Sequence, residues 1–165
     1  SLRNHPQSRP FVSVSELIDL EGDNCLSDSN KPGDPHAWLK VQTIRFATHE
    51  KDGVISAAAE SRPFHIVAFT ADPGEGSEPA NFGLCRYADV AGWSWSSFCK
   101  TQYASNPSLG DVANFLKCHL GLISVLDKAK ELGILHEVHD EAGYWEKRNV
   151  AALVKEVGMW NRMIA

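Results

Sequence analysis

The sequence predicts an α+β fold: a mostly antiparallel sheet of five or six strands, with a long helix and a C-terminal helix packed on it and a short helix near the N-terminus. Short runs rich in β-branched and aromatic residues, separated by turn residues, fill much of residues 38–103. A long amphipathic pattern covers residues 109–132, and a second begins near Asn149. Because the strands and helices come in blocks rather than in alternation, the order favours α+β. A length of 165 residues predicts one domain over residues 1–165.

The N-terminal half is expected to hold one short helix followed by strands. Ser13 to Glu16 has the spacing of a capping box, which predicts a helix over residues 14–20 that Gly22 can end. Residues 22–36 have the composition of a loop. Asp52-Gly53 is a hairpin signal, because both residue types tolerate positive φ. The predicted strands are residues 38–47, 54–58, 64–70, 81–87 and 95–103.

The C-terminal half is expected to form a helix, a short strand and a second helix. Ser108 is a suitable N-cap for the helix over residues 109–132, and Gly133 can end it. Residues 134–139 are predicted to be a short strand, followed by a turn over residues 140–143. Asn149 is the predicted N-cap of the last helix.

Charge and composition exclude several classes of partner. The net charge of −5 and the pI of about 5.8 argue against nucleic-acid binding, which usually requires a basic excess. No apolar stretch approaches the roughly 20 residues that span a bilayer, so no membrane partner is expected. The polar N-terminus shows no signal-peptide pattern, and the four cysteines form no CxxC pair. We therefore expect a cytoplasmic location with reduced thiols.

His119 is the first candidate catalytic residue. It falls within the apolar stripe of the long predicted helix, so its imidazole is expected to be largely buried. Burial disfavours the charged imidazolium, and a neutral imidazole suits a general base. Asp140 or Glu141 could orient it, and hydrolysis is the default reaction because no cofactor signature is present. The alternative is a core histidine bonded to a carbonyl or a carboxylate.

A metal site is not expected, although His136 and His139 lie close to Asp140 and Glu141. In the predicted strand these two imidazoles point to opposite faces and cannot share one ion. Cys85 and Cys99 each lie next to a basic residue in the sequence, but no family signature supports a thiol nucleophile. The loop over residues 72–79 lacks the Gly-Lys-Ser/Thr ending of a phosphate-binding loop and the ligand pattern of a calcium-binding loop.

Two segments carry the candidate ligand-binding residues. The first combines two tryptophans with polar groups that could bind a sugar or a base: Trp93, Trp95, Lys100, Gln102 and Tyr103. The second follows the predicted turn and contains Tyr144, Trp145 and Arg148, of which the arginine could clamp a carboxylate or phosphate. For both segments the alternative is packing of the aromatic residues against the protein itself.

Two functions follow from these residues. The first is a small-molecule-binding or hydrolase-like domain with an aromatic-lined cleft, and no cofactor. The second is a non-catalytic protein-interaction or homodimerisation module, because Trp, Tyr and Arg are common interface anchors.

Overall fold

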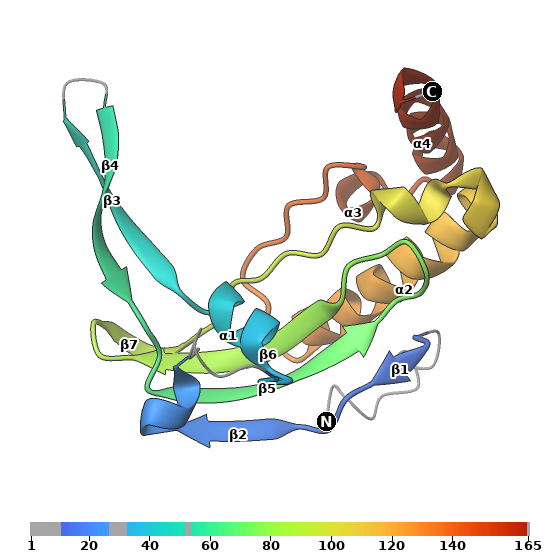
Figure 1. Cartoon of the computed structure of the whole chain (residues 1–165). Coiled ribbons are helices and arrows are strands. Elements are labelled where there is room, and N and C mark those ends of the chain that lie inside the picture. The colour runs from blue at the N-terminus through green and yellow to red at the C-terminus, as the bar shows by residue number, and fades with distance from the viewer. Residues whose placement is uncertain (1–10, 27–32, 52–53, 165) are drawn as a thin grey trace. The chain divides into compact units, whose positions relative to one another are not determined.

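The computed structural model describes residues 11–26, 33–51 and 54–164, and it confirms the α+β class (Figure 1). It contains an antiparallel five-stranded sheet, a two-stranded sheet, a long helix and a C-terminal helix. Contacts between residues divide the chain into two compact units. Unit 1 comprises residues 1–14, 71–80 and 99–165, and unit 2 comprises residues 15–70 and 81–98. The expectation of a single domain over residues 1–165 stays a prediction.

The five-stranded sheet has the order β1-β5-β6-β7, and β2 also pairs with β5. All the pairings with a defined register are antiparallel; in one of them Glu21 lies opposite His65. The strands are β1 (Ser13–Val14), β2 (Ile18–Glu21), β5 (His65–Asp72), β6 (Ala80–Tyr87) and β7 (Val90–Ser94). The predicted strands over residues 64–70 and 81–87 are confirmed.

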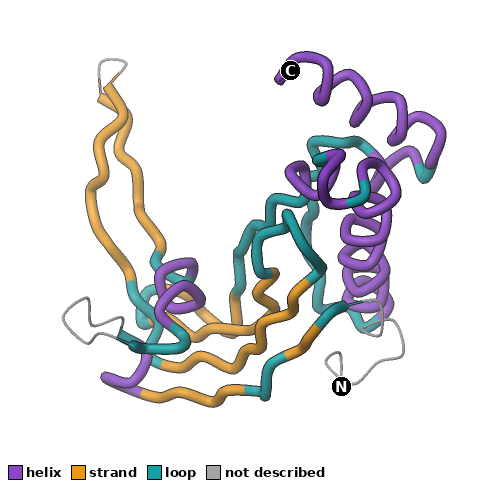
Figure 2. The backbone as a smooth tube through the Cα atoms, turned by 45° about the vertical axis from the view of Figure 1, so that its right-hand side comes forward, coloured by secondary structure: helices purple, strands orange, loops and turns teal. Residues whose placement is uncertain are grey.

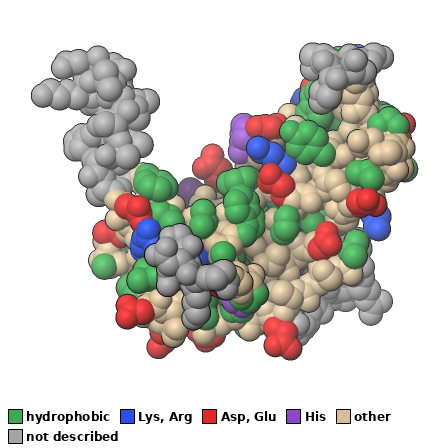
Figure 3. Space-filling model, viewed as in Figure 1, with side chains coloured by type: hydrophobic (Ala, Val, Ile, Leu, Met, Phe, Trp, Pro, Cys, Tyr) green, Lys and Arg blue, Asp and Glu red, His purple; other side chains and the backbone are tan. Residues whose placement is uncertain are grey.

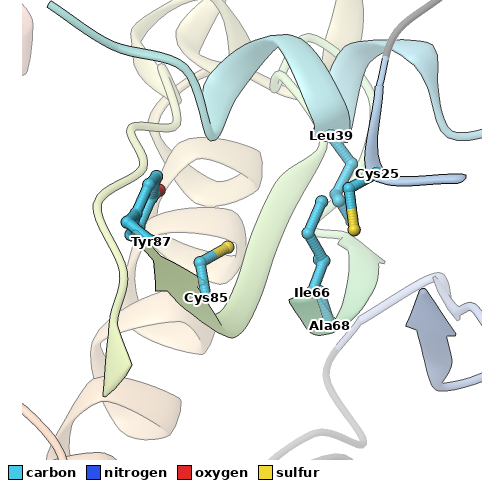
Figure 4. Close-up of a cluster of buried hydrophobic side chains, with 6 residues drawn as sticks. All are labelled: Cys25, Leu39, Ile66, Ala68, Cys85 and Tyr87. Carbon is cyan, nitrogen blue, oxygen red and sulfur yellow. The ribbon is translucent and has the colours of Figure 1, made fainter. Parts of the chain in front are cut away.

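One face of this sheet carries the core of unit 2. Alternate residues of β5 and β6 point into it and meet Leu39 of α1 (Ala37–Gln42) and Cys25 of a 3-10 turn (Gly22–Cys25), as Figure 4 shows. The buried hydroxyl of Tyr87 donates a hydrogen bond to the carbonyl of Thr43 at 2.7 Å, which fixes the end of α1 to β6. The cluster consists of Cys25, Leu39, Ile66, Ala68, Cys85 and Tyr87.

The two-stranded sheet is the predicted hairpin. β3 (Arg45–Lys51) pairs antiparallel with β4 (Val54–Ser61), so the hairpin prediction is confirmed, while its turn residues lie outside the described part of the chain. Two contacts fix its base near the β6–β7 connection. The Arg45 guanidinium lies 5.2 Å from the centre of the Tyr87 ring, and the Ser61 hydroxyl donates to Asp89 at 2.7 Å.

Unit 1 is built mainly from helices, coloured purple in Figure 2. The long helix α2 (Asp111–Glu131) packs against α4 (Val150–Ile164) through Phe115, Cys118, Leu153 and Val157. The end of α2 and the start of α4 have the predicted caps. After α2, Gly133 has φ of 69°, and at the start of α4 the Asn149 side chain accepts a hydrogen bond from the backbone N–H of Ala152 at 3.0 Å. The unit also contains the shorter elements η4 (Gln102–Ser105), η5 (Pro107–Leu109) and α3 (Tyr144–Lys147), as well as β1.

The predicted N-terminal helix is wrong, because the structure has β1 and β2 there. Ile18 and Leu20 alternate with polar residues, and this period of two places them on the core face when β2 pairs with β5. The Ser15 hydroxyl accepts a hydrogen bond from the backbone N–H of Thr70 rather than capping a helix. Pairing with a distant strand therefore outweighs the local capping-box signal.

Four further expectations about elements are corrected. The segment predicted as a strand over residues 38–47 begins with the helix α1. Residues 134–139, also predicted to be a strand, are irregular. The predicted strand over residues 95–103 is irregular over residues 95–100 and is followed by η4. Around residue 97, the Ser97 hydroxyl donates to the carbonyl of Asn81 at 2.8 Å and accepts from the Trp95 indole, so side chains take the place of a strand ladder. The long helix begins at Asp111 rather than after Ser108, because Pro107–Leu109 forms a 3-10 turn capped by Asn106.

Candidate functional site

His119 lies on α2 with its ring between two aromatic side chains. Phe115, one helical turn earlier, stacks on it with ring centres 5.1 Å apart, as expected for residues four apart on a helix. Tyr144 meets it edge-on at 6.5 Å. Only 11% of the His119 side chain is exposed, so the predicted inward direction of the ring is what the structure has.

The two ring nitrogens of His119 have different polar neighbours. Nδ1 lies 3.2 Å from the hydroxyl oxygen of Thr101, within hydrogen-bond distance. Nε2 lies 3.5 Å from Oδ2 of Asp140, an ion-pair distance. Nε2 is buried and has no partner with hydrogen-bond geometry among the residues that the structure describes. A buried polar atom of this kind calls for a reason, such as proton transfer or a bound group.

Asp140 is held in place by the turn that follows it. One carboxylate oxygen accepts from the backbone N–H of Ala142 at 3.0 Å, and the other accepts from that of Trp145 at 2.8 Å. Burial acts to raise the pKa of Asp140, but the contact with His119 and these N–H donors outweigh it and lower the pKa to about 2. The carboxylate is therefore ionised at neutral pH and has a fixed direction.

Together these residues form a chain of hydroxyl, imidazole and carboxylate. We call it the Thr101–His119–Asp140 chain. In nucleophilic catalysis the carboxylate orients the imidazole and stabilises its charged form, while the imidazole takes a proton from the hydroxyl. Thr101 is buried, with 7% of the residue exposed.

The third predicted catalytic residue, Glu141, is exposed, and the polar contact of His119 on this loop is Asp140. Of the predicted ligand-binding residues near Thr101, Lys100 is exposed and its backbone N–H donates to the Glu78 carboxylate at 3.0 Å. Gln102 and Tyr103 begin η4, and Tyr103 is exposed.

Arg148 is already engaged within unit 1. Its guanidinium binds both carboxylate oxygens of Asp127, at 2.7 and 2.8 Å, and lies 4.4 Å from the centre of the Trp145 ring. The Tyr144 ring is 5.8 Å from the same guanidinium. These contacts account for the side chains of the second predicted ligand-binding segment, since the bidentate pair occupies the fork that would clamp an acidic ligand.

Trp93 and Trp95 belong to unit 2. Trp93 is 46% exposed on β7, with its ring centre 5.0 Å from that of His65. Trp95 follows the strand; a Cβ on Gly83 would lie 2.9 Å from the Trp95 ring, so this glycine allows the ring to approach β6 closely. Sequence reasoning grouped both tryptophans with His119, which belongs to unit 1.

Metal and thiol chemistry find little support in the described residues. His136 and His139 are exposed, and no group of three or more histidine, cysteine or acidic side chains there could hold a metal ion. All four cysteines are free thiols. Burial raises the pKa of Cys85 and Cys99 to about 12, which keeps both thiols protonated and weakly nucleophilic at neutral pH.

None of the described helices is long and apolar enough to cross a membrane. We also compared the chain with known protein families, characterised proteins and solved structures. No match is found.

Sequence reasoning missed Thr101, and it also missed the pair formed by His65 and Asp19, whose side chains lie 2.7 Å apart. Thr101 is 18 residues from His119, and its place depends on how η4 packs on α2. For Asp19 a signal exists, because the alternation of Ile18 to Glu21 is typical of a strand with two carboxylates on one face.

Proposed function

We propose that this protein binds a small molecule and hydrolyses it, with His119 as general base, Asp140 as the carboxylate that orients it, and the Thr101 hydroxyl as the group it activates. The observation that carries the proposal is the 3.2 and 3.5 Å contacts that link these three side chains in series. The two backbone N–H donors on Asp140 support it, because they hold the carboxylate in one direction.

The chemistry follows from the order of the groups. When the Thr101 oxygen attacks an electrophilic carbon or phosphorus, its proton passes to Nδ1 of His119. The imidazole is then positively charged, and the ionised carboxylate of Asp140 beside Nε2 stabilises it. The imidazolium gives this proton to the departing oxygen as the bond from that oxygen to the carbon or phosphorus breaks, and water then cleaves the Thr101 ester in the same way and restores the hydroxyl. General-base assistance of this kind contributes about 10²- to 10⁴-fold to a rate.

A panel of chromogenic esters, phosphate monoesters and glycosides tests the proposal. We expect turnover of at least one class, reduced about 100-fold or more in Thr101→Val, His119→Gln and Asp140→Asn proteins that keep their helical circular dichroism. Glu141→Gln is the matched control, because Glu141 is the exposed neighbour of Asp140 and should retain the activity.

Two outcomes would reject the proposal. One is a folded His119→Gln protein as active as the natural chain. The other is the absence of turnover with every class in the panel. Equal losses in Glu141→Gln and Asp140→Asn would also contradict the role of Asp140.

We further propose a cytoplasmic location, which the four free thiols support.

A second candidate function, homodimerisation, is favoured by a separate observation in unit 2. Trp38 on α1 and Phe98 meet edge to face at 6.1 Å, yet both rings are about half exposed. Figure 3 shows further hydrophobic side chains on the visible surface. Large aromatic side chains of this kind are typical interface anchors.

Light scattering over a dilution series tests this candidate. If the protein is a homodimer, the measured mass should fall towards that of one chain on dilution, and Phe98→Ala should raise the concentration at which the dimer dissociates. The mass of a single chain at every concentration would reject homodimerisation through this pair.

A further inference from the structure

The face of the sheet opposite the core of unit 2 carries a second group of chemically active side chains. Asp19 lies between two residues packed on the core, His65 precedes the buried Ile66, and Arg86 lies between Cys85 and Tyr87 of the core cluster. Because side chains alternate along a strand, Asp19, His65 and Arg86 project from the other face. Four strands that are neighbours through β5 and β6 contribute to this group: β2, β5, β6 and β7.

The acidic part of the group surrounds His65. Nε2 of His65 lies 2.7 Å from a carboxylate oxygen of Asp19, and Nδ1 lies 3.7 Å from one of Glu21. Both carboxylates are mostly exposed, whereas the imidazole is mostly covered. Asp19 and Glu21 are two steps apart on β2, about 7 Å along the strand. They therefore present hydrogen-bond acceptors to solvent on either side of one imidazole.

The aromatic part of the group lies beside the same imidazole. The Trp93 ring is 46% exposed and meets the His65 ring at 5.0 Å. The Arg86 guanidinium lies 5.8 Å from the centre of the Trp93 ring and 5.5 Å from that of Phe64, which is also exposed. Stacking between a cation and two rings holds the arginine on this face and leaves its N–H groups near the tryptophan.

We infer that this face is a binding site for a neutral sugar ring. A half-exposed indole offers a flat apolar surface to the C–H side of a pyranose, as amphipathic ligands require. Asp19 and Glu21 can accept hydrogen bonds from sugar hydroxyls, and Arg86 can donate to them. Hydrogen bonds to charged groups are the stronger kind, so a few of them suffice to fix orientation.

The charges favour a neutral ligand over an ionic one. An anion such as a phosphate would face two carboxylates, and a cation would meet the Arg86 guanidinium beside Trp93. The face therefore holds charges of both signs, so an ion of either sign meets a like charge there. This inference rests on unit 2 alone and does not depend on the hydrolase proposal.

Nuclear magnetic resonance with the full chain tests the site directly. The probes are glucose, galactose, mannose, N-acetylglucosamine, maltose and cellobiose, and the signal is the indole N–H of Trp93, assigned by its loss in Trp93→Phe. We expect at least one sugar to shift this signal in a saturable way. Saturation-transfer spectra of the sugar do not require the indole signal and measure the affinity of every variant. Trp93→Ala should weaken binding about tenfold or more, and Asp19→Asn should weaken it as well.

Phe46→Ala is the matched control, because Phe46 is an exposed aromatic residue of unit 2 that lies on β3 rather than on this face. It should leave the affinity unchanged. The inference is overturned if no sugar shifts the Trp93 signal, if Phe46→Ala weakens binding as much as Trp93→Ala, or if a lysine-rich peptide or glucose 6-phosphate binds more tightly than every neutral sugar.

Discussion

Replacing Asp140 by Asn should destabilise the protein by an amount that depends on pH. The carboxylate is buried, accepts two backbone hydrogen bonds and lies 3.5 Å from His119. Its pKa is lowered from 3.8 to about 2, and this difference corresponds to about 2 kcal/mol of stability when the carboxylate is ionised. We therefore expect Asp140→Asn to lower the free energy of unfolding by about 2 kcal/mol near neutral pH, and the melting temperature by roughly 4–8 °C.

The sign of the pH dependence follows from the lowered pKa. A carboxyl group that binds protons less readily in the folded state stabilises the fold above its unfolded pKa of 3.8, and it loses this contribution as the pH falls towards about 2. The Asn variant has no such proton to bind. The gap in stability between the two proteins should therefore be full at about pH 6 and should close towards about pH 2.

Urea denaturation of both proteins, followed by circular dichroism across this pH range, measures the gap. Other acidic groups with lowered pKa, such as Asp34 beside Lys40, affect both proteins equally and cancel in the comparison. A constant gap between about pH 6 and pH 2, or no gap near neutral pH, would refute the reasoning.

Three further outcomes are expected. Gly76→Ala should lower the free energy of unfolding by about 2 kcal/mol or more, because φ is +81° and the added Cβ would lie 2.8 Å from backbone atoms. Gly133→Ala, with φ of +69° and open space around it, should lower it by about 1 kcal/mol, and thermal melts of both variants measure the difference. Cys85 and Cys99, whose pKa values are raised to about 12, should react with iodoacetamide at about pH 8 far more slowly than in the unfolded chain, and equal rates would contradict their burial. Asn149→Ala should cost about 1 kcal/mol in urea denaturation through loss of the α4 N-cap, and an unchanged midpoint would show that the cap contributes nothing.

The elements that the sequence predicts correctly are those with long or local signals. The period of α2 extends over about six turns, and its end at Gly133 depends on one residue with positive φ. Asn149 likewise marks the start of α4 through contacts within one helical turn. For β5 and β6, an apolar run of strand length bounded by turn residues is enough.

The wrong elements are those that distant partners decide. Residues 13–20 satisfy a capping box locally, yet their hydrogen bonds go to β5, about 50 residues further along the chain. Residues 134–139 have the composition of a strand, but the structure gives them no strand partner among the described residues. Short segments carry too little local preference to outweigh such tertiary contacts.

The same limit applies to the candidate sites. The inward direction of His119 follows from helical periodicity, and the position of Asp140 beside it agrees with a carboxylate as the orienting group. Thr101 carries no sequence signal that would link it to His119. The pair of His65 and Asp19 requires the register between β2 and β5, which residue types alone do not provide.

The protonation of the His119 ring tests the Thr101–His119–Asp140 chain most directly. Nitrogen-15 spectra of the imidazole distinguish a proton on Nε2 from one on Nδ1. The proposed chain predicts the proton on Nε2, facing Asp140, with Nδ1 accepting from Thr101, and a change of this state in Asp140→Asn. A proton on Nδ1, or spectra that are identical in the natural chain and in Asp140→Asn, would contradict the coupling on which the proposed chemistry depends.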